Sequence, residues 1–219
     1  MIVRALAVSC LLAWPAVAPA QDAEPATASP PEVERTRPTD RSATTIAAFL
    51  GGGAIGLGLH EAGHLLMVSA FGADPGVKNV SFGPIPFFAI THADVTPTEE
   101  YTISAAGFWV QHASSEWLLT RRPGLRREQA PLAKGLLAFN VLASVAYATA
   151  AFGTFGPYER DTRAMADALD VCEPWVGAMI LAPAVLDTWR YMRPQSRWAA
   201  WSSRALKAGA VLIVVRAAR

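Results

Sequence analysis

Cysteine is nearly absent from this chain, which has two in 219 residues. Cys10 lies in an apolar N-terminal segment with the features of an export signal, so cleavage would leave Cys172 alone. A single cysteine cannot form an internal disulfide, and cysteine usage therefore says nothing about the redox compartment.

Charge of either sign is also scarce. Only 17% of the residues are charged and the net charge is +1, so the composition gives no indication of nucleic-acid binding. Hydrophobic residues make up 52% of the chain and the mean hydropathy is +0.25, which is more apolar than a typical soluble domain. The apolar residues come in long blocks without alternation, and this pattern predicts an integral membrane protein.

Five apolar blocks are each close to the roughly 20 residues that a helix needs to cross a bilayer. They cover residues 45–72, 101–119, 132–155, 173–192 and 199–215. We therefore expect an all-α polytopic membrane protein with about four to five transmembrane helices.

The chain divides into three regions by composition. Residues 1–20 contain Arg4, an apolar run and the small-residue pattern Ala18-Pro19-Ala20, which predict a signal peptide or an uncleaved N-terminal anchor. Residues 21–44 are rich in Pro, Ala, Thr and charges, and this predicts a disordered tether. Residues 45–217 form the expected membrane-embedded domain.

The motif His60-Glu61-Ala62-Gly63-His64 lies inside the first long apolar block. Two histidines four residues apart share one face of an α-helix and can hold one metal ion. Glu61 points away from that face, towards a water molecule on the metal, so the motif predicts a zinc site with Glu61 as general base. The alternative interpretation is a buried polar cluster that only joins helices. Ionisable groups inside a membrane-length block favour a functional site.

Residues 76–91 separate the first two blocks. Their glycines and prolines exclude a helix, and their β-branched and aromatic residues favour strands, so we expect a short β-hairpin or a re-entrant loop. Non-helical backbone at membrane depth must be buried by protein or line a cavity, which places this segment beside the metal. An exposed strand edge there would hold an extended peptide by main-chain hydrogen bonds. A simple interfacial loop is the alternative.

A catalytic zinc site needs a third protein ligand, and this ligand must come from another segment. Asp187 is the lone acid of an apolar segment and follows Pro183, a residue type that kinks helices. Four other candidates remain open: His92, Asp94, His112 and Glu116.

The order of these motifs resembles the site-2 protease family of intramembrane zinc metalloproteases, peptidase family M50. The resemblance covers about residues 45–192 and rests on the His60–His64 motif, Phe82-Gly83-Pro84, Ala105-Ala106-Gly107 and Pro183-x-x-Leu186-Asp187. It implies the zinc ligands His60, His64 and Asp187, and Glu61 as the base. It also implies substrate contacts by Phe82, Gly83, Pro84 and Gln111.

Four positions depart from the pattern of that family, and one of them is the asparagine usual before Pro183-x-x-Leu186-Asp187, which is missing here. Phe108 follows Gly107 where proline is usual, Gln111 stands where asparagine is usual, and Thr188 follows Asp187 in place of glycine. Gln111 retains an amide that can hydrogen-bond a substrate backbone.

We therefore expect an intramembrane zinc metalloprotease-like protein, multi-pass in a bacterial-type inner membrane and surrounded by the lipid bilayer. Its substrate would be a membrane-associated polypeptide, hydrolysed by a zinc-bound water that Glu61 activates. The alternative is a catalytically inactive, metal-binding membrane scaffold or adaptor of the same fold.

Charge along the chain gives two conflicting orientations. Basic residues in 121–134 and 190–204 mark two cytoplasmic loops, and acidic residues in 159–173 mark the opposite side. A cleaved signal would place residues 21–44 outside, and two crossings from there would return the basic loop 121–134 to the outside. These three assumptions cannot all be correct: a cleaved signal, two crossings before residue 121, and cytoplasmic basic loops.

Overall fold

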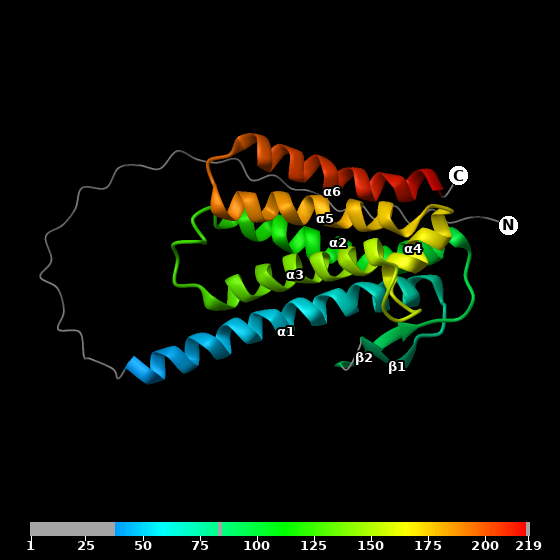
Figure 1. Cartoon of the computed structure of the whole chain (residues 1–219), viewed down its shortest axis with the longest axis horizontal. Helices are drawn as coiled ribbons and strands as arrows, with labels where there is room; N and C mark the ends of the chain where they lie inside the picture. Colours follow the sequence, from blue (N-terminus) through cyan, green and yellow to red (C-terminus); the bar gives the residue numbers. More distant parts are fainter. Residues whose placement is uncertain (1–37, 83–84, 218–219) are drawn as a thin grey trace, which may run out of the picture. The chain divides into compact units, whose positions relative to one another are not determined.

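The computed structural model describes residues 38–82 and 85–217, and this part of the chain is mostly helical with one small sheet (Figure 1). The helices are α1 (Pro38–Phe71), α2 (Pro97–Arg121), α3 (Pro131–Gly153), α4 (Asp161–Leu169), α5 (Glu173–Met192) and α6 (Arg197–Ala217). The strands are β1 (Gly76–Phe82) and β2 (Ile85–Thr91). The secondary structure therefore confirms a mainly α-helical fold with a short β-hairpin.

Proline marks the start of several helices. Pro97 and Pro131 stand in the first turn of α2 and α3, where a missing amide hydrogen costs no helical bond. At α2, Thr96 adds a capping box with Glu99, whose carboxylate accepts a hydrogen bond from the Thr96 amide at 2.9 Å. These signals explain why α2 begins before residue 101.

Helix α1 begins at Pro38, earlier than the composition predicts. Residues 38–44, which we expected in the disordered tether, are therefore helical, and that boundary is corrected. A proline at the first helical position followed by residues without a further Pro or Gly permits this earlier start. The expected signal peptide or anchor and the rest of the tether lie outside the described residues.

Strands β1 and β2 pair antiparallel, from Gly76 opposite Thr91 to Phe82 opposite Ile85. This confirms the hairpin predicted for residues 76–91. Gly83 and Pro84, at its tip, lie outside the described residues, as does the side chain of Phe82.

Glycines bring α1 and α3 into close backbone contact. A Cβ atom at Gly52 would lie 2.0 Å from the carbonyl oxygen of Leu132, and one at Gly135 would lie 1.9 Å from that of Phe49. Small residues at a helix interface allow this approach, which is typical of membrane helix pairs. The packing fixes α1, and with it the histidine motif, against the rest of the bundle.

Helix α2 forms the interior of the bundle. Tyr101, Ala105 and Phe108 on α2 pack against Met165 of α4 and Val176 of α5 in one buried cluster. The short helix α4 is therefore held against the same part of α2 that faces α1.

Two helical segments are long and apolar enough to cross a membrane, Ser42–Phe71 and Pro131–Gly153. Helices α4 and α5, which meet at an angle of 119°, pass the same test as a bent pair. On α1, the large apolar side chains of Ile46, Leu50 and Leu66 are more than half exposed, at 57%, 64% and 62%. The described residues thus contain two or three such segments, fewer than the expected four to five.

Candidate metal centre

Three ligand-type side chains meet where α1 passes the start of α4. Nε2 of His60 lies 3.0 Å from Nε2 of His64, and Oδ2 of Asp161 lies 3.4 Å and 3.5 Å from these two atoms. Both imidazoles are buried. Within residues 38–82 and 85–217, these three form the one group of His, Cys, Asp or Glu ligand atoms close enough to share an ion.

The spacing of these atoms fits a zinc ion. Bonds of about 2.0–2.1 Å in a tetrahedron place neighbouring ligand atoms about 3.3 Å apart. The observed distances of 3.0, 3.4 and 3.5 Å lie around that value. Two imidazole nitrogens and one carboxylate are a donor set found in hydrolytic zinc sites, where the fourth position stays open.

His64 is oriented by the backbone of α2. Its Nδ1 donates a hydrogen bond to the carbonyl oxygen of Ile103 at 2.7 Å. This bond places the ring hydrogen on Nδ1 and leaves the lone pair of Nε2 free for a metal. The ring of His60 packs edge-on against Phe108, with 5.3 Å between ring centroids.

Asp187, expected as the third ligand, lies in a different cluster. Its carboxylate accepts hydrogen bonds from Ser203 at 2.7 Å and Lys207 at 2.8 Å, both on α6, and Arg190 lies 3.5 Å away. A lone acid in an apolar helix needs a partner, but here cations and a hydroxyl supply it. The structure therefore replaces Asp187 by Asp161 in the candidate ligand set.

The four competing candidates also lie outside the ligand group. His92 and Asp94 line the adjacent cavity, and Nε2 of His92 lies 3.5 Å from a carboxylate oxygen of Glu100. His112 is buried on α2. Glu116 accepts hydrogen bonds from three basic side chains: Arg190, Arg204 and Lys207.

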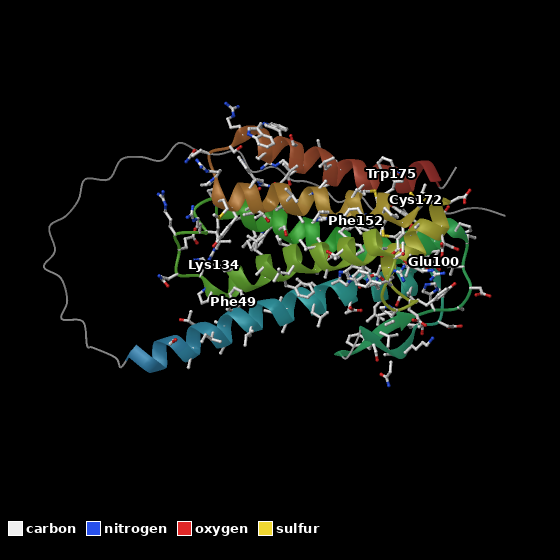
Figure 2. All side chains as sticks on the ribbon, in the orientation of Figure 1. Phe49, Glu100, Lys134, Phe152, Cys172 and Trp175 are labelled. Carbon is white, nitrogen blue, oxygen red and sulfur yellow. The ribbon has the colours of Figure 1, made fainter. Side chains whose placement is uncertain are left out.

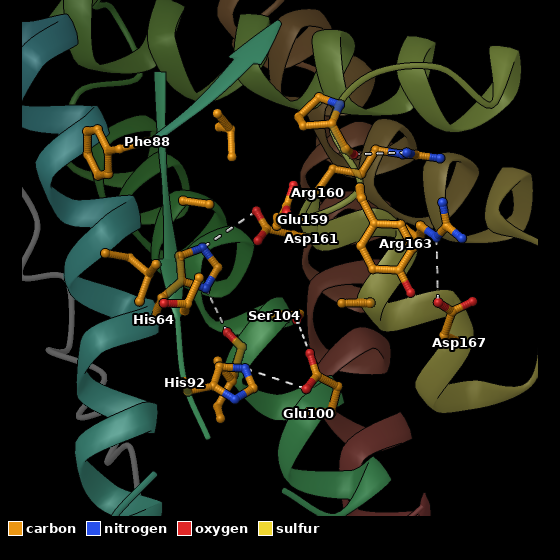
Figure 3. Close-up of a pocket in the computed structure, with 18 of the residues that line it drawn as sticks. His64, Phe88, His92, Glu100, Ser104, Glu159, Arg160, Asp161, Arg163 and Asp167 are labelled. Atoms are coloured by element: carbon orange, nitrogen blue, oxygen red, sulfur yellow. Dashed lines mark hydrogen bonds and ion pairs between the residues drawn. The ribbon is translucent and has the colours of Figure 1, made fainter. Parts of the chain in front are cut away.

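A cavity of about 750 Å³ opens beside the centre, as Figure 3 shows. Glu61 and His64 of α1, Asp161 of α4 and residues 88–91 of β2 all line it. This volume is typical of small-ligand sites. The predicted general base, two of the ligand residues and a strand of the hairpin therefore face one space.

An ion pair joins the hairpin to a residue that lines this space. Lys78 of β1 donates a hydrogen bond to Glu159, in the loop before α4, and this bond holds the pKa of Glu159 below its usual range. On the same wall, the guanidinium of Arg163 lies 4.0 Å from the ring centroid of Tyr158 and pairs with Asp167. The contact between Lys78 and Glu159 ties the hairpin to the segment that carries Asp161.

Gln111 is buried at 1% exposure, and its side-chain amide has no hydrogen-bond partner within the described part of the chain. It lies one helical turn beyond Gly107, which contacts the histidines. Gln111 is not among the described residues that line the cavity, so its substrate contact stays a prediction. The same holds for Phe82, Gly83 and Pro84.

Nothing in the local sequence marks Asp161 as a metal ligand. It is 101 residues from His60, and the charge pattern groups it with the acidic residues of 159–173. An acid in the first turn of a helix signals only a helix start.

The chain matches no protein-family model, no curated protein and no solved structure. The likeness to site-2 proteases therefore rests on the motifs alone.

Proposed function

We propose that this protein is an intramembrane zinc metallopeptidase of the site-2 protease type that hydrolyses membrane-associated polypeptides. The observation that carries the proposal is the convergence of His60, His64 and Asp161 at 3.0–3.5 Å beside a cavity lined by Glu61. The ligand set differs from the one that the family resemblance implies, because Asp161 takes the place of Asp187.

The chemistry follows from the roles of these side chains. A zinc ion held by His60, His64 and Asp161 would supply Lewis acidity towards a water molecule and a peptide carbonyl. Glu61 faces the cavity without belonging to the ligand group, so its carboxylate takes a proton from the attacking water. The same group then protonates the leaving amine.

The hairpin offers a means of presenting the substrate. Residues 88–91 of β2 line the cavity, and β1 covers only one edge of this strand. A substrate segment that pairs with the other edge would be held extended, which frees its peptide bonds from helical hydrogen bonding.

We also propose that the helices form a multi-pass bundle in a bacterial-type inner membrane. Two segments have the required length and apolarity, and the exposed apolar side chains of α1 suit contact with lipid.

The structure suggests an orientation for this bundle. The start of α1, the basic α2–α3 connection and Lys134 of α3 lie at one end, whereas Glu100 and Cys172 lie at the other (Figures 1 and 2). The positive-inside rule then makes the first end cytoplasmic and opens the cavity to the opposite side. In this orientation α1 begins in the cytoplasm, which is incompatible with a cleaved signal followed directly by a translocated tether.

Comparison of wild type with Glu61→Gln and His64→Ala tests the proposed activity. Zinc content and cleavage of a reporter whose transmembrane segment carries Gly or Pro are both measured. Glu61→Gln should keep the metal and lose about two to four orders of magnitude in rate, because only the base is removed. His64→Ala should lose both metal and activity. Glu100→Gln, another cavity-lining glutamate, is the matched control and should stay active.

Each outcome of this comparison has a distinct meaning. Equal cleavage by wild type and Glu61→Gln would show that Glu61 is not the base. Zinc binding by wild type without cleavage of any reporter in a broad panel would favour the inactive scaffold or adaptor. A wild-type protein without zinc would exclude the metallopeptidase.

A further inference from the structure

The two residues next to Asp161 in the sequence, Arg160 and Thr162, both donate hydrogen bonds to the carboxylate of Glu173. Arg160 donates to Glu173 from Nε at 2.6 Å and from Nη2 at 2.5 Å. The Thr162 hydroxyl donates to Oε1 of the same glutamate at 2.6 Å. Arg160 is 8% exposed and Thr162 is completely buried. Glu173 thus holds the chain immediately before and immediately after the candidate ligand.

This arrangement accounts for the direction of the Asp161 side chain. Asp161 is the first residue of α4, and neighbouring residues of an α-helix point about 100° apart. With Arg160 and Thr162 bound to Glu173, the side chain between them is directed to His60 and His64. Because Arg160 is engaged in a bidentate pair, the nearest cation in sequence does not compete for the Asp161 carboxylate.

Glu173 also joins the two sides of a sharp bend. It is the first residue of α5, which meets the nine-residue helix α4 at 119°. Arg160 reaches back as well, donating from Nη1 to the carbonyl oxygen of Pro157 at 3.0 Å. The loop before α4, the first turn of α4 and the start of α5 are therefore bound to one another at this point.

We propose that Glu173 is a positioning residue for the metal centre. Its three hydrogen bonds hold residues 160–162 so that the Asp161 carboxylate faces the histidines, and in this way they set the metal affinity. The inference rests on the metal centre of the proposed function. Glu173 lies outside the ligand group and acts only through Arg160 and Thr162.

The test uses the full chain in detergent and two readouts: zinc affinity, by competition with a chromophoric chelator, and the visible absorption of bound Co²⁺. Glu173→Gln keeps the size of the side chain and removes its charge. We expect zinc to bind roughly 10- to 100-fold more weakly, as for other residues that orient metal ligands. The Co²⁺ spectrum should shift towards that of Asp161→Asn, since the carboxylate is no longer held at the ion.

Three further variants define the contact. Thr162→Val removes one of the three hydrogen bonds and should give a smaller loss in the same direction. Arg160→Met combined with Glu173→Gln should cost less than the sum of the two single changes, because both single changes act on one shared contact. Glu128→Gln, a glutamate paired with Arg122 in the α2–α3 connection, is the matched control and should keep wild-type affinity.

The outcomes separate this inference from the function on which it rests. A role in folding alone would lower the melting temperature of Glu173→Gln and leave its Co²⁺ spectrum at saturating metal unchanged, which would overturn the inference. Unchanged zinc affinity in Glu173→Gln, with wild type binding zinc, would also overturn it while the metal centre stands. A wild-type chain that binds neither metal would remove the metal centre and this inference together.

Discussion

Gly107 of α2 lies directly against the ring of His60 of α1. A Cβ atom at position 107 would lie 2.5 Å from Cε1 of His60, and also 2.6 Å from Nε2 of His64. No side chain fits there unless the histidines move. The absence of a side chain at residue 107 is therefore a condition for the geometry of the candidate metal centre.

Gly107→Ala should weaken zinc binding by roughly tenfold or more, because adding even one methyl group to a closely packed site displaces its neighbours. Zinc affinity measured by competition checks this expectation. Gly58→Ala on α1, where an added Cβ meets nothing within 4 Å, is the matched control and should bind zinc as wild type does. Equal affinities for the two variants would contradict the packing described for Gly107.

The two candidate aspartates should behave in opposite ways. Asp161→Ala removes a ligand and should abolish stoichiometric zinc binding while changing the fold little. Asp187→Ala removes the closer of the two carboxylates that pair with Lys207, leaves Glu116 at 3.3 Å from its amine, and should destabilise the protein by about 1–3 kcal/mol, yet keep the metal. Zinc content and thermal unfolding of both variants distinguish the roles. Loss of zinc in Asp187→Ala with retention in Asp161→Ala would restore the ligand set that the family resemblance implies.

The local elements of this fold could be predicted because local patterns encode them. The apolar block 173–192 coincides with α5, and the Gly, Pro and β-branched residues of 76–91 gave the hairpin. Helix α4 was missed because its nine residues are far shorter than a membrane-length block. Its sequence, with several charged residues, resembles an ordinary loop.

The metal site could be predicted only in part. His60, Glu61 and His64 stand on one helix, so their spacing places them together. The partner of a buried acid depends on how distant helices pack, and both Asp161 and Asp187 obtained theirs from such contacts. The sequence shows that Asp187 is a lone acid that needs a partner. In the structure this partner is the amine of Lys207, 20 residues away, and not a metal ion.

Removal of the metal should lower the thermal stability of the protein. Without an ion, two buried imidazoles and a carboxylate lose the partner that binds only the folded state. We expect a chelator to lower the melting temperature of the wild type and added zinc to restore it. The same treatment should not change the melting temperature of His64→Ala, which lacks a complete site. An equal shift in both proteins would mean that the chelator acts elsewhere.

The proposed orientation can be tested with the native cysteine of the acidic end. Cys172 is exposed, whereas Gln129 and Gln195 are exposed in the two basic connections at the other end. In a Cys10→Ser background, a membrane-impermeant maleimide should label Cys172 in bacterial spheroplasts. With Cys172→Ser added, cysteines introduced by Gln129→Cys or Gln195→Cys should react only after permeabilisation, since basic connections remain cytoplasmic. The reverse labelling pattern would show that the bundle has the opposite orientation, and it would favour a translocated tether after a cleaved signal. Labelling at both ends without permeabilisation would show that the bundle does not cross the membrane.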